Sequence, residues 1–300
     1  MRIYYLIAAF FMAMLFNGSS FSGDYQSQTL IIANWGKADG EFGLILEAEG
    51  NCPQSLSVDA SGNIAILDLV NKRVQIYSSE GKWLGKFSIT SQAFDIQYAD
   101  GQIILLAPYD YVLEQYDLQG RLIKKMTIDR ELGFLDGLRA SNQKVYIQTI
   151  EQTQYDIADL SLAKALPSVS PGVSAHFPDL RFHTQWLDDH RGNLFIENIR
   201  TGGKQTIPIT TQDELGSIVF LDADRYGNIF LRKELFDPHG HSYFAVDKLD
   251  DKGNLMATVS IPNINVVAPF KPITIDREGN IYFLSIESER FSVIRWQSQK

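Results

Sequence analysis

Three histidines are the residues of this chain whose types and spacing could support chemistry. His239 and His241 flank one glycine, and Asp237 lies beside them, so this loop could supply part of a divalent-metal site. His183 could add a further ligand, or act as an acid or base, because imidazole titrates near neutral pH. An exposed polar loop also explains the pair, because spacing alone is a weak signal for metal ligands, and a lone histidine on a packed strand is more often a hydrogen-bonded structural residue. Both interpretations stay open at this point.

A second group of residues could bind a ligand without reacting with it. Tyr109, Asp110 and Tyr111 follow one another, and Arg290 could lie near them in a closed fold. Tyrosine and arginine dominate the energetics of binding surfaces, so these residues could stack on sugar rings or hold a peptide. Ordinary packing of aromatic side chains is the alternative.

The motifs of the common catalytic classes are missing from the sequence. It contains no Gly-x-Ser-x-Gly elbow, no phosphate-binding glycine loop and no His-Glu-x-x-His helix. We therefore predict no catalytic residues. Enzymatic activity remains as the alternative, in the form of a metal-dependent hydrolase or lyase of lactonase type, in which a divalent cation activates water.

Charge and cysteine content restrict the class of protein further. The 300 residues include 27 Lys and Arg against 36 Asp and Glu, giving a formal net charge of −9. An acidic surface repels phosphate backbones, so we expect no nucleic-acid partner. Cys52 is the single cysteine, so the fold holds without an intramolecular disulfide.

The N-terminus has the composition of an export signal. Arg2 precedes an apolar run over residues 3–16, and small and polar residues follow over 17–22. The run of about 14 apolar residues is shorter than the roughly 18 to 20 that span a bilayer. We predict a signal peptide at residues 1–22, one domain over 23–300, a secreted or periplasmic location, and no membrane insertion after removal of the signal.

A repeated turn motif shows how the chain must be organised. The pattern Asp-x-x-Gly-Asn occurs at 59–63, 189–193, 224–228 and 276–280, each time between short apolar runs, and again in a later turn at 250–254. Asp can accept hydrogen bonds from the backbone that follows it, and Gly and Asn tolerate the positive φ of tight hairpin loops. Six units of about 43 residues follow from the spacing, which is the length of a propeller blade. Their turn residues are Gly62, Gly101, Asn142, Gly192, Gly227 and Gly279.

The unit structure predicts the architecture. Alternating apolar residues indicate four antiparallel strands in a unit, with the boundaries between 129 and 181 left open. The last unit has three strands, and residues 29–35 form an unassigned strand near the N-terminus. We predict an all-β, six-bladed β-propeller of four-stranded blades, closed when this N-terminal strand completes the last blade. His183 would lie on the innermost strand of unit four.

Residues 35–89 resemble the NHL repeat. The resemblance rests on Trp35 to Phe42, Gly62-Asn63, Leu67-Asp68 and the run Asn71-Lys72-Arg73-Val74. It implies six blades around a central channel, used mainly as a binding platform and occasionally as a lyase or hydrolase. It also implies that Asp68, Asn71 and Arg73 form a network that braces a loop, on the face where ligands usually bind.

The prediction for function follows from these points. We expect a monomeric, exported binding or scaffolding propeller that engages a protein, peptide or glycan through its loop face. Asp68, Asn71, Arg73, Tyr109, Asp110, Tyr111 and Arg290 are the candidate binding residues. We expect no cofactor, and a divalent metal held by His183, His239 and His241 belongs to the hydrolase or lyase alternative.

Overall fold

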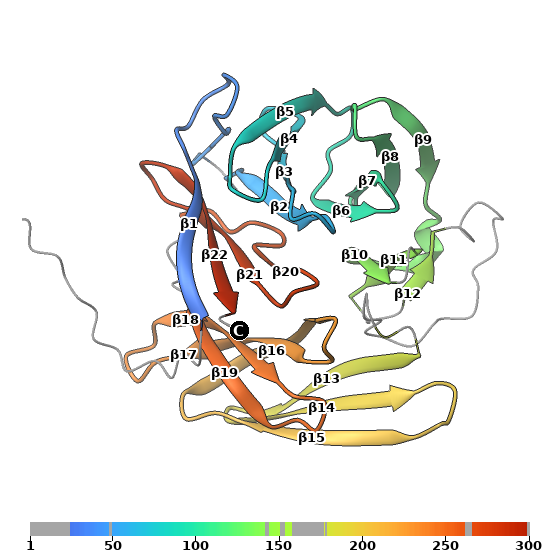
Figure 1. Ribbon diagram of the computed structural model, residues 1–300, viewed down its shortest axis with the longest axis vertical. Helices are drawn as coiled ribbons and strands as arrows, with labels where there is room; N and C mark the ends of the chain where they lie inside the picture. Colours follow the sequence, from blue (N-terminus) through green and yellow to red (C-terminus); the bar gives the residue numbers. More distant parts are fainter. Residues whose placement is uncertain are drawn as a thin grey trace, which may run out of the picture.

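The computed structural model confirms the predicted all-β, six-bladed propeller. Six antiparallel sheets surround one axis as blades, and one turn of 3-10 helix, Arg130–Leu132, is the helical element of the described residues (Figure 1). The predicted signal peptide and most of the region between 158 and 178 lie outside the described residues. Those described are 25–47, 50–141, 144–150, 154–157, 177, 179–261 and 266–298.

Four blades have four strands. Blade one contains β2 (Pro53–Val58), β3 (Ile64–Asp68), β4 (Arg73–Tyr77) and β5 (Trp83–Ser88). Blade two contains β6 (Asp95–Ala99), β7 (Gln102–Ala107), β8 (Val112–Asp117) and β9 (Leu122–Thr127). Blade five contains β16 (Glu214–Ala223), β17 (Ile229–Phe236), β18 (Ser242–Leu249) and β19 (Leu255–Ile261). Blade six contains β20 (Ile273–Ile275), β21 (Ile281–Ile286), β22 (Phe291–Ser298) and β1 (Tyr25–Ala33).

The other two blades each show three strands within the described residues. Blade three contains β10 (Leu135–Ser141), β11 (Lys144–Thr149) and β12 (Gln154–Asp156). Blade four contains β13 (Leu180–Asp188), β14 (Arg191–Asn198) and β15 (Lys204–Thr210).

The Asp-initiated turns form through local hydrogen bonds. Oδ1 of Asp59 accepts the backbone N–H groups of Ser61 and Asn63, both at 2.8 Å, and Oδ2 accepts from the Asn63 side chain. One carboxylate therefore satisfies three donors of a tight turn. The turns that begin at Asp117, Asp224, Asp237, Asp250 and Asp276 repeat the two backbone bonds.

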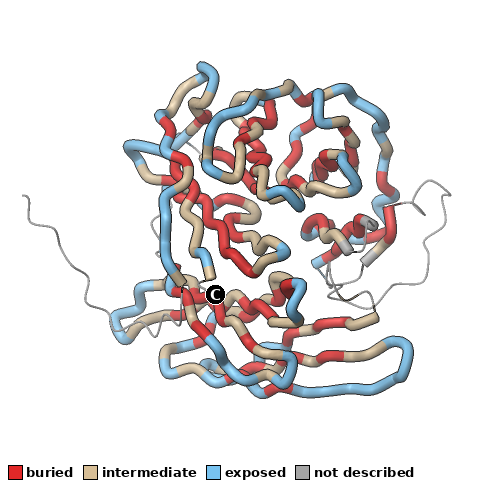
Figure 2. The backbone as a smooth tube through the Cα atoms, in the orientation of Figure 1, coloured by how far each residue is buried: buried red, intermediate tan, exposed pale blue. Residues whose placement is uncertain are grey.

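Segments from the two ends of the chain share blade six. β1 pairs antiparallel with β22, from Tyr25 opposite Ser298 to Ala33 opposite Phe291. Apolar clusters fill the spaces between most pairs of successive blades, and Ile31 belongs to the cluster that joins blade six to blade one. Burial is highest along the inner and middle strands, while much of the outer rim is exposed (Figure 2).

In blade four, β13 does not have the direction expected of the innermost strand that was predicted there. Thr184 Oγ1 donates to the Ile218 carbonyl and Trp186 Nε1 to the Leu215 carbonyl, so β13 runs antiparallel to β16. By contrast, the innermost strand of blade one is bridged in parallel to blade six, between Ser55 and Lys271. β13, β14 and β15 therefore have the directions of the second, third and fourth strands of a blade.

The turn predicted at 189–193 is wrong for the same reason. Asp188 is opposite Arg191, and its Oδ1 accepts the N–H of His190 at 3.0 Å, so the connection is shorter and begins one residue earlier. Gly192 lies within β14 rather than in a turn. The sequence match here reflects the residue types and not their place in a blade.

Candidate functional site

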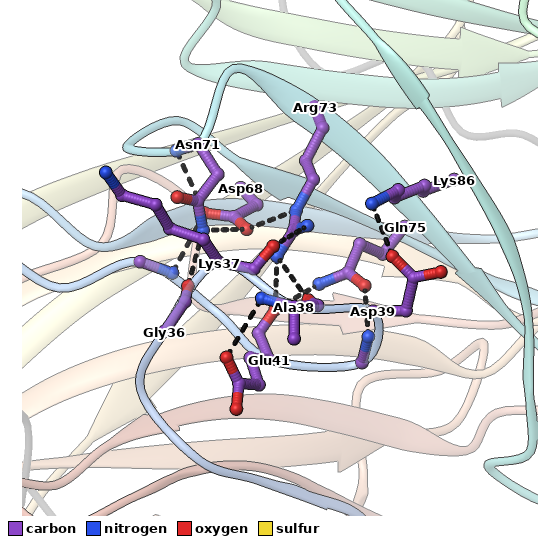
Figure 3. Close-up of polar contacts among 12 residues, drawn as sticks. Gly36, Lys37, Ala38, Asp39, Glu41, Asp68, Asn71, Arg73, Gln75 and Lys86 are labelled. Atoms are coloured by element: carbon purple, nitrogen blue, oxygen red, sulfur yellow. Dashed lines mark hydrogen bonds and ion pairs between the residues drawn. The ribbon is translucent and has the colours of Figure 1, made fainter.

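Asp68, Asn71 and Arg73 form a network within the protein (Figure 3). Asp68 is fully buried, and its Oδ2 accepts from Arg73 Nε and from the Asn71 amide, both at 2.9 Å. The remaining guanidinium nitrogens of Arg73 donate to the carbonyls of Lys37, Ala38 and Glu41. A buried arginine is stabilised only when its donors are satisfied in this way.

The consequence of this network is a fixed loop. Asn71 also donates to the Gly36 carbonyl at 2.8 Å, and Asp68 Oδ1 accepts the Gly43 N–H at 3.1 Å. The three side chains hold the segment between β1 and β2 against the turn between β3 and β4. Their polar atoms face this segment, which leaves little of Asp68 and Arg73 for an external ligand.

A groove lies on the loop face, which is the face that carries the connections between second and third strands and between successive blades. Its volume is about 740 Å³. Tyr109 is 71% exposed beside it and contacts the Phe94 ring edge-on, with the ring centroids 5.0 Å apart. The groove is lined by Leu46, Gly50, Asn51, Gln54, Phe94, Tyr109, Val266, Val267 and Ala268.

The other predicted binding residues lie outside this groove. The Tyr111 hydroxyl donates to the Gly133 carbonyl at 3.1 Å, and its ring is covered by the Arg130 guanidinium, so Tyr111 packs toward blade three. Asp110 is exposed between the two tyrosines. Arg290 is exposed in the β21–β22 turn and pairs with Glu287 at 3.4 Å. The structure therefore separates Tyr109 from Tyr111 and Arg290.

The histidines are explained by local structure. His239 and His241 occupy the turn that begins at Asp237, where His241 stands in the place of the usual Asn and its Nδ1 lies 3.1 Å from Asp237 Oδ2. His183 stacks on Phe195 in blade four, with centroids 5.7 Å apart. In the described part of the chain no three His, Cys, Asp or Glu side chains are grouped to hold a metal.

Two cavities follow the central channel. The wide chamber, about 590 Å³, extends to the face opposite the loop face and is lined by residues that include Ser57, Tyr98, Asp222 and Arg277. The inner chamber, about 180 Å³, lies nearer the loop face and is lined by residues that include Asp95, Asp136, Arg139, Arg232, Phe270 and Lys271. Arg139 and Lys271 line both chambers. No residue of β13 lines either chamber, so His183 belongs to neither of them.

Charged side chains connect the blades across the inner chamber. Asp95 is fully buried and its Oδ2 accepts the Leu138 N–H at 2.7 Å and Lys271 Nζ at 3.3 Å. Lys271 also donates to the Leu138 carbonyl, and Arg139 donates to the Leu221 carbonyl, both at 3.0 Å. Burial lowers the pKa of Lys271, an effect that Asp95 opposes by favouring the ammonium form.

Sequence reasoning did not identify Arg139, Arg232 or Lys271. Arg139 is the one cation of β10, Lys271 stands directly before β20, and Arg232 is followed by Lys233 and Glu234 in β17. Charged residues within or beside strands were the available signal, because long charged side chains are seldom buried unless they have partners. The role of these cations depends on residues of other blades, which the local sequence does not specify.

Fold and channel together define a six-bladed β-propeller with a charged, two-chambered centre. No protein-family model matches the chain, and no curated protein matches it, so membership of the NHL family stays a prediction. A structure of a DUF4221-family member from Bacteroides vulgatus is similar, with a TM-score of 0.53, 10% identity, and coverage of 92% of this chain and 99% of the other.

Two enzymes have similar folds at comparable identity. A luciferin-regenerating enzyme matches with a TM-score of 0.50 and 12% identity, covering 82% of this chain and 91% of its own. A streptogramin B lyase matches with a TM-score of 0.49 and 9% identity, covering 94% and 100%. At such identities the likeness concerns the fold alone. Among the described residues, no helix is long and apolar enough to cross a membrane.

Proposed function

We propose that this protein is an exported binding propeller that engages a peptide segment of a protein partner through the groove beside Tyr109. The observation that carries the proposal is the exposure of Tyr109 together with its fixed position. The residue is 71% exposed, and its ring rests edge-on against Phe94. An aromatic side chain that is held in place loses little conformational entropy on binding, which is why such residues dominate interface energetics.

The composition of the groove favours a peptide over a glycan. Leu46, Val266, Val267 and Ala268 supply aliphatic side chains, and these suit an apolar side chain of a partner. Sugar rings bind by stacking on aromatic faces, and Tyr109 is the one strongly exposed aromatic ring that lines this groove.

The side-chain amide of Gln54, which lines the groove, is hydrogen-bonded within the protein. Gln54 Nε2 donates to the Cys52 carbonyl and Oε1 accepts the Phe270 N–H. Hydroxyl groups of a glycan would therefore find few free polar partners at this position. The metal-dependent hydrolase or lyase has no comparable observation in its favour.

The export part of the proposal rests on the N-terminal sequence. Arg2, the apolar run over 3–16 and the polar segment over 17–22 have the order of a secretory signal. Expression of the full chain in a bacterial host, followed by mass spectrometry of the periplasmic fraction, tests it. Protein that begins near Gly23 is the expected result, and full-length protein confined to the cytoplasm contradicts it.

Site-specific photocrosslinking tests the binding face. A photoreactive phenylalanine replaces Tyr109 in one variant and Tyr226 in another, and Tyr226 is 57% exposed in a turn on the opposite face. After illumination in cells of the native host, we expect discrete protein adducts from position 109 and none of the same mass from position 226. Equal adducts from both positions, or none from 109, contradict the proposal.

Tyr109→Ala gives the complementary result. The ring is exposed, so its removal should change the free energy of unfolding by less than about 1 kcal/mol. Loss of a central aromatic contact typically weakens an interface by about 2 kcal/mol or more, which is a fall in affinity of at least tenfold. Titration of the crosslinked partner against the Tyr109→Ala and Tyr226→Ala proteins measures this difference.

A further inference from the structure

The inner chamber carries more positive charge than its acidic residues neutralise. Arg139, Arg232 and Lys271 line it together with Asp95 and Asp136. Asp95 is already engaged, because its carboxylate accepts two backbone N–H groups as well as Lys271. Asp136 accepts from the Gln148 side chain at 2.9 Å. The chamber is therefore lined by more cationic than acidic side chains, although the protein as a whole is acidic.

Arg232 is the cation of the chamber whose guanidinium is incompletely hydrogen-bonded within the described part of the chain. Its Nε is buried and has no hydrogen-bond partner among the described residues. Its guanidinium lies over the Phe244 ring, 5.1 Å from the centroid, so one face is covered by an apolar group. Burial lowers the pKa of Arg232 and Arg139 acts in the same direction, whereas Glu234 and Asp136 oppose this effect by favouring the charged form. A buried donor without a partner is destabilising, and more so when the group is charged.

The other two cations are fixed at the chamber wall. Arg139 donates to the Leu221 carbonyl, and its Nε also contacts Gln148 Oε1 at 3.3 Å. Lys271 is held between Asp95 and the Leu138 carbonyl. Asp95 balances the charge of Lys271. The partners of Arg139 are neutral oxygens, which orient its guanidinium without cancelling its charge, so this positive potential stays within the chamber.

From these observations we infer that the channel contains a binding site for a small oxyanion, a carboxylate or phosphate group, centred on Arg232. A planar guanidinium matches both groups because its N–H donors pair with two oxygens at once. Arg139 adds to the attraction from the same chamber. The site is separate from the Tyr109 groove and does not depend on the function proposed for it.

The size of the two chambers limits the ligand. The inner chamber, at about 180 Å³, holds an anionic group and a few further atoms. The wide chamber leads to it from the opposite face and offers polar walls that include Ser57, Asp222 and Thr274. A small metabolite with an anionic end and a polar body fits this shape, whereas a polymer does not.

Calorimetric titration of the folded protein with inorganic phosphate, acetate and succinate tests the site, and chloride at equal ionic strength controls for screening. We expect saturable binding of at least one oxyanion with a dissociation constant below about 1 mM, and a rise in melting temperature that follows its concentration. Phosphate binding without carboxylate binding, or the reverse, identifies which of the two oxyanions the site prefers.

Variants locate the site. Arg232→Met should weaken binding roughly tenfold or more, and Arg232→Lys should weaken it less, since it keeps the charge but loses the paired donors. Arg121→Met is the matched control, because Arg121 is an exposed arginine in the β8–β9 turn. Should Arg232→Met not fold, the Arg232→Lys protein still supplies the comparison. No binding to the wild-type protein at about 10 mM oxyanion, or equal losses in Arg121→Met, overturns the inference.

Discussion

Lys125 Nζ donates to Glu114 Oε1 over 2.8 Å, and this pair joins the third strand of blade two to its outermost strand. Glu114 is fully buried and also accepts hydrogen bonds from the hydroxyls of Thr90, Ser91 and Tyr116. Burial alone would raise the pKa of this carboxyl. The bonds from Lys125 and the three hydroxyls outweigh burial and lower the pKa to about 2.

The Glu114 network predicts a loss of stability in acid. The pKa is near 4.5 in the unfolded chain and about 2 in the folded protein. The stabilisation is therefore complete above pH 4.5 and is lost as the pH falls toward 2. We expect Glu114→Gln to lower the free energy of unfolding by roughly 3 kcal/mol at pH 7, and by clearly less near pH 3.

Urea denaturation at the two pH values measures this effect. Glu131→Gln, at an exposed position before β10, serves as the control and should differ little from wild type at either pH. A deficit for Glu114→Gln that is the same at both pH values would show that the network does not depend on the carboxylate charge.

Loss of the Arg73 guanidinium should destabilise the propeller strongly. Arg73→Met leaves the buried Asp68 carboxylate without its charged partner, which typically costs about 3 kcal/mol or more. Lys86→Met removes an exposed pair with Asp39 at the same segment, and such pairs contribute about 1 kcal/mol or less. Comparable losses in the two variants, measured by urea denaturation, would contradict a structural role for Arg73.

Two glycines allow the contact between blade one and β1 to be measured. Gly81 and Gly40 have positive φ values of 78° and 79°, so alanine is strained at both. A Cβ on Gly81 would also lie 2.0 Å from the Leu30 carbonyl oxygen in β1, whereas a Cβ on Gly40 would meet nothing within 4 Å. We expect Gly81→Ala to cost about 1 to 3 kcal/mol more than Gly40→Ala. Equal melting temperatures for the two variants would mean that β1 moves away freely.

Removal of the N-terminal strand should abolish cooperative folding. Deletion of residues 23–36 takes away β1 and exposes the edge of β22, together with the cluster that contains Ile31. We expect a broad, low-temperature transition in differential scanning calorimetry of the truncated protein. A sharp transition at the wild-type temperature would rule out closure of the ring by this strand.

The turns show what could be predicted from sequence. Asp59 bonds to backbone groups two and four residues ahead, and Asp224 and Asp276 do the same. These interactions lie within five residues, so residue types in a short window determine them. Repetition of such windows at blade spacing then indicates the number of blades.

Blade four shows where this reasoning fails. Asp189 to Asn193 has the same residue types, yet Asp188 forms the turn and β13 runs antiparallel to β16. The direction of a strand depends on the neighbours it packs against. For β13 these include Ile218 and Leu215 in blade five, and the local sequence does not encode them.

The sequence by itself therefore determined the fold class, the number of blades and the hairpin turns that begin at Asp59, Asp224 and Asp276, because all three arise from local hydrogen bonding and alternating polarity. Only the tertiary structure decided the sites. Asp95, Arg139 and Lys271 come from blades two, three and six, and they meet because the ring brings their strands to one axis. Likewise, the groove beside Tyr109 includes Val266 from a distant connection. Contacts between residues so far apart depend on how the blades pack, and no pattern within one repeat specifies them.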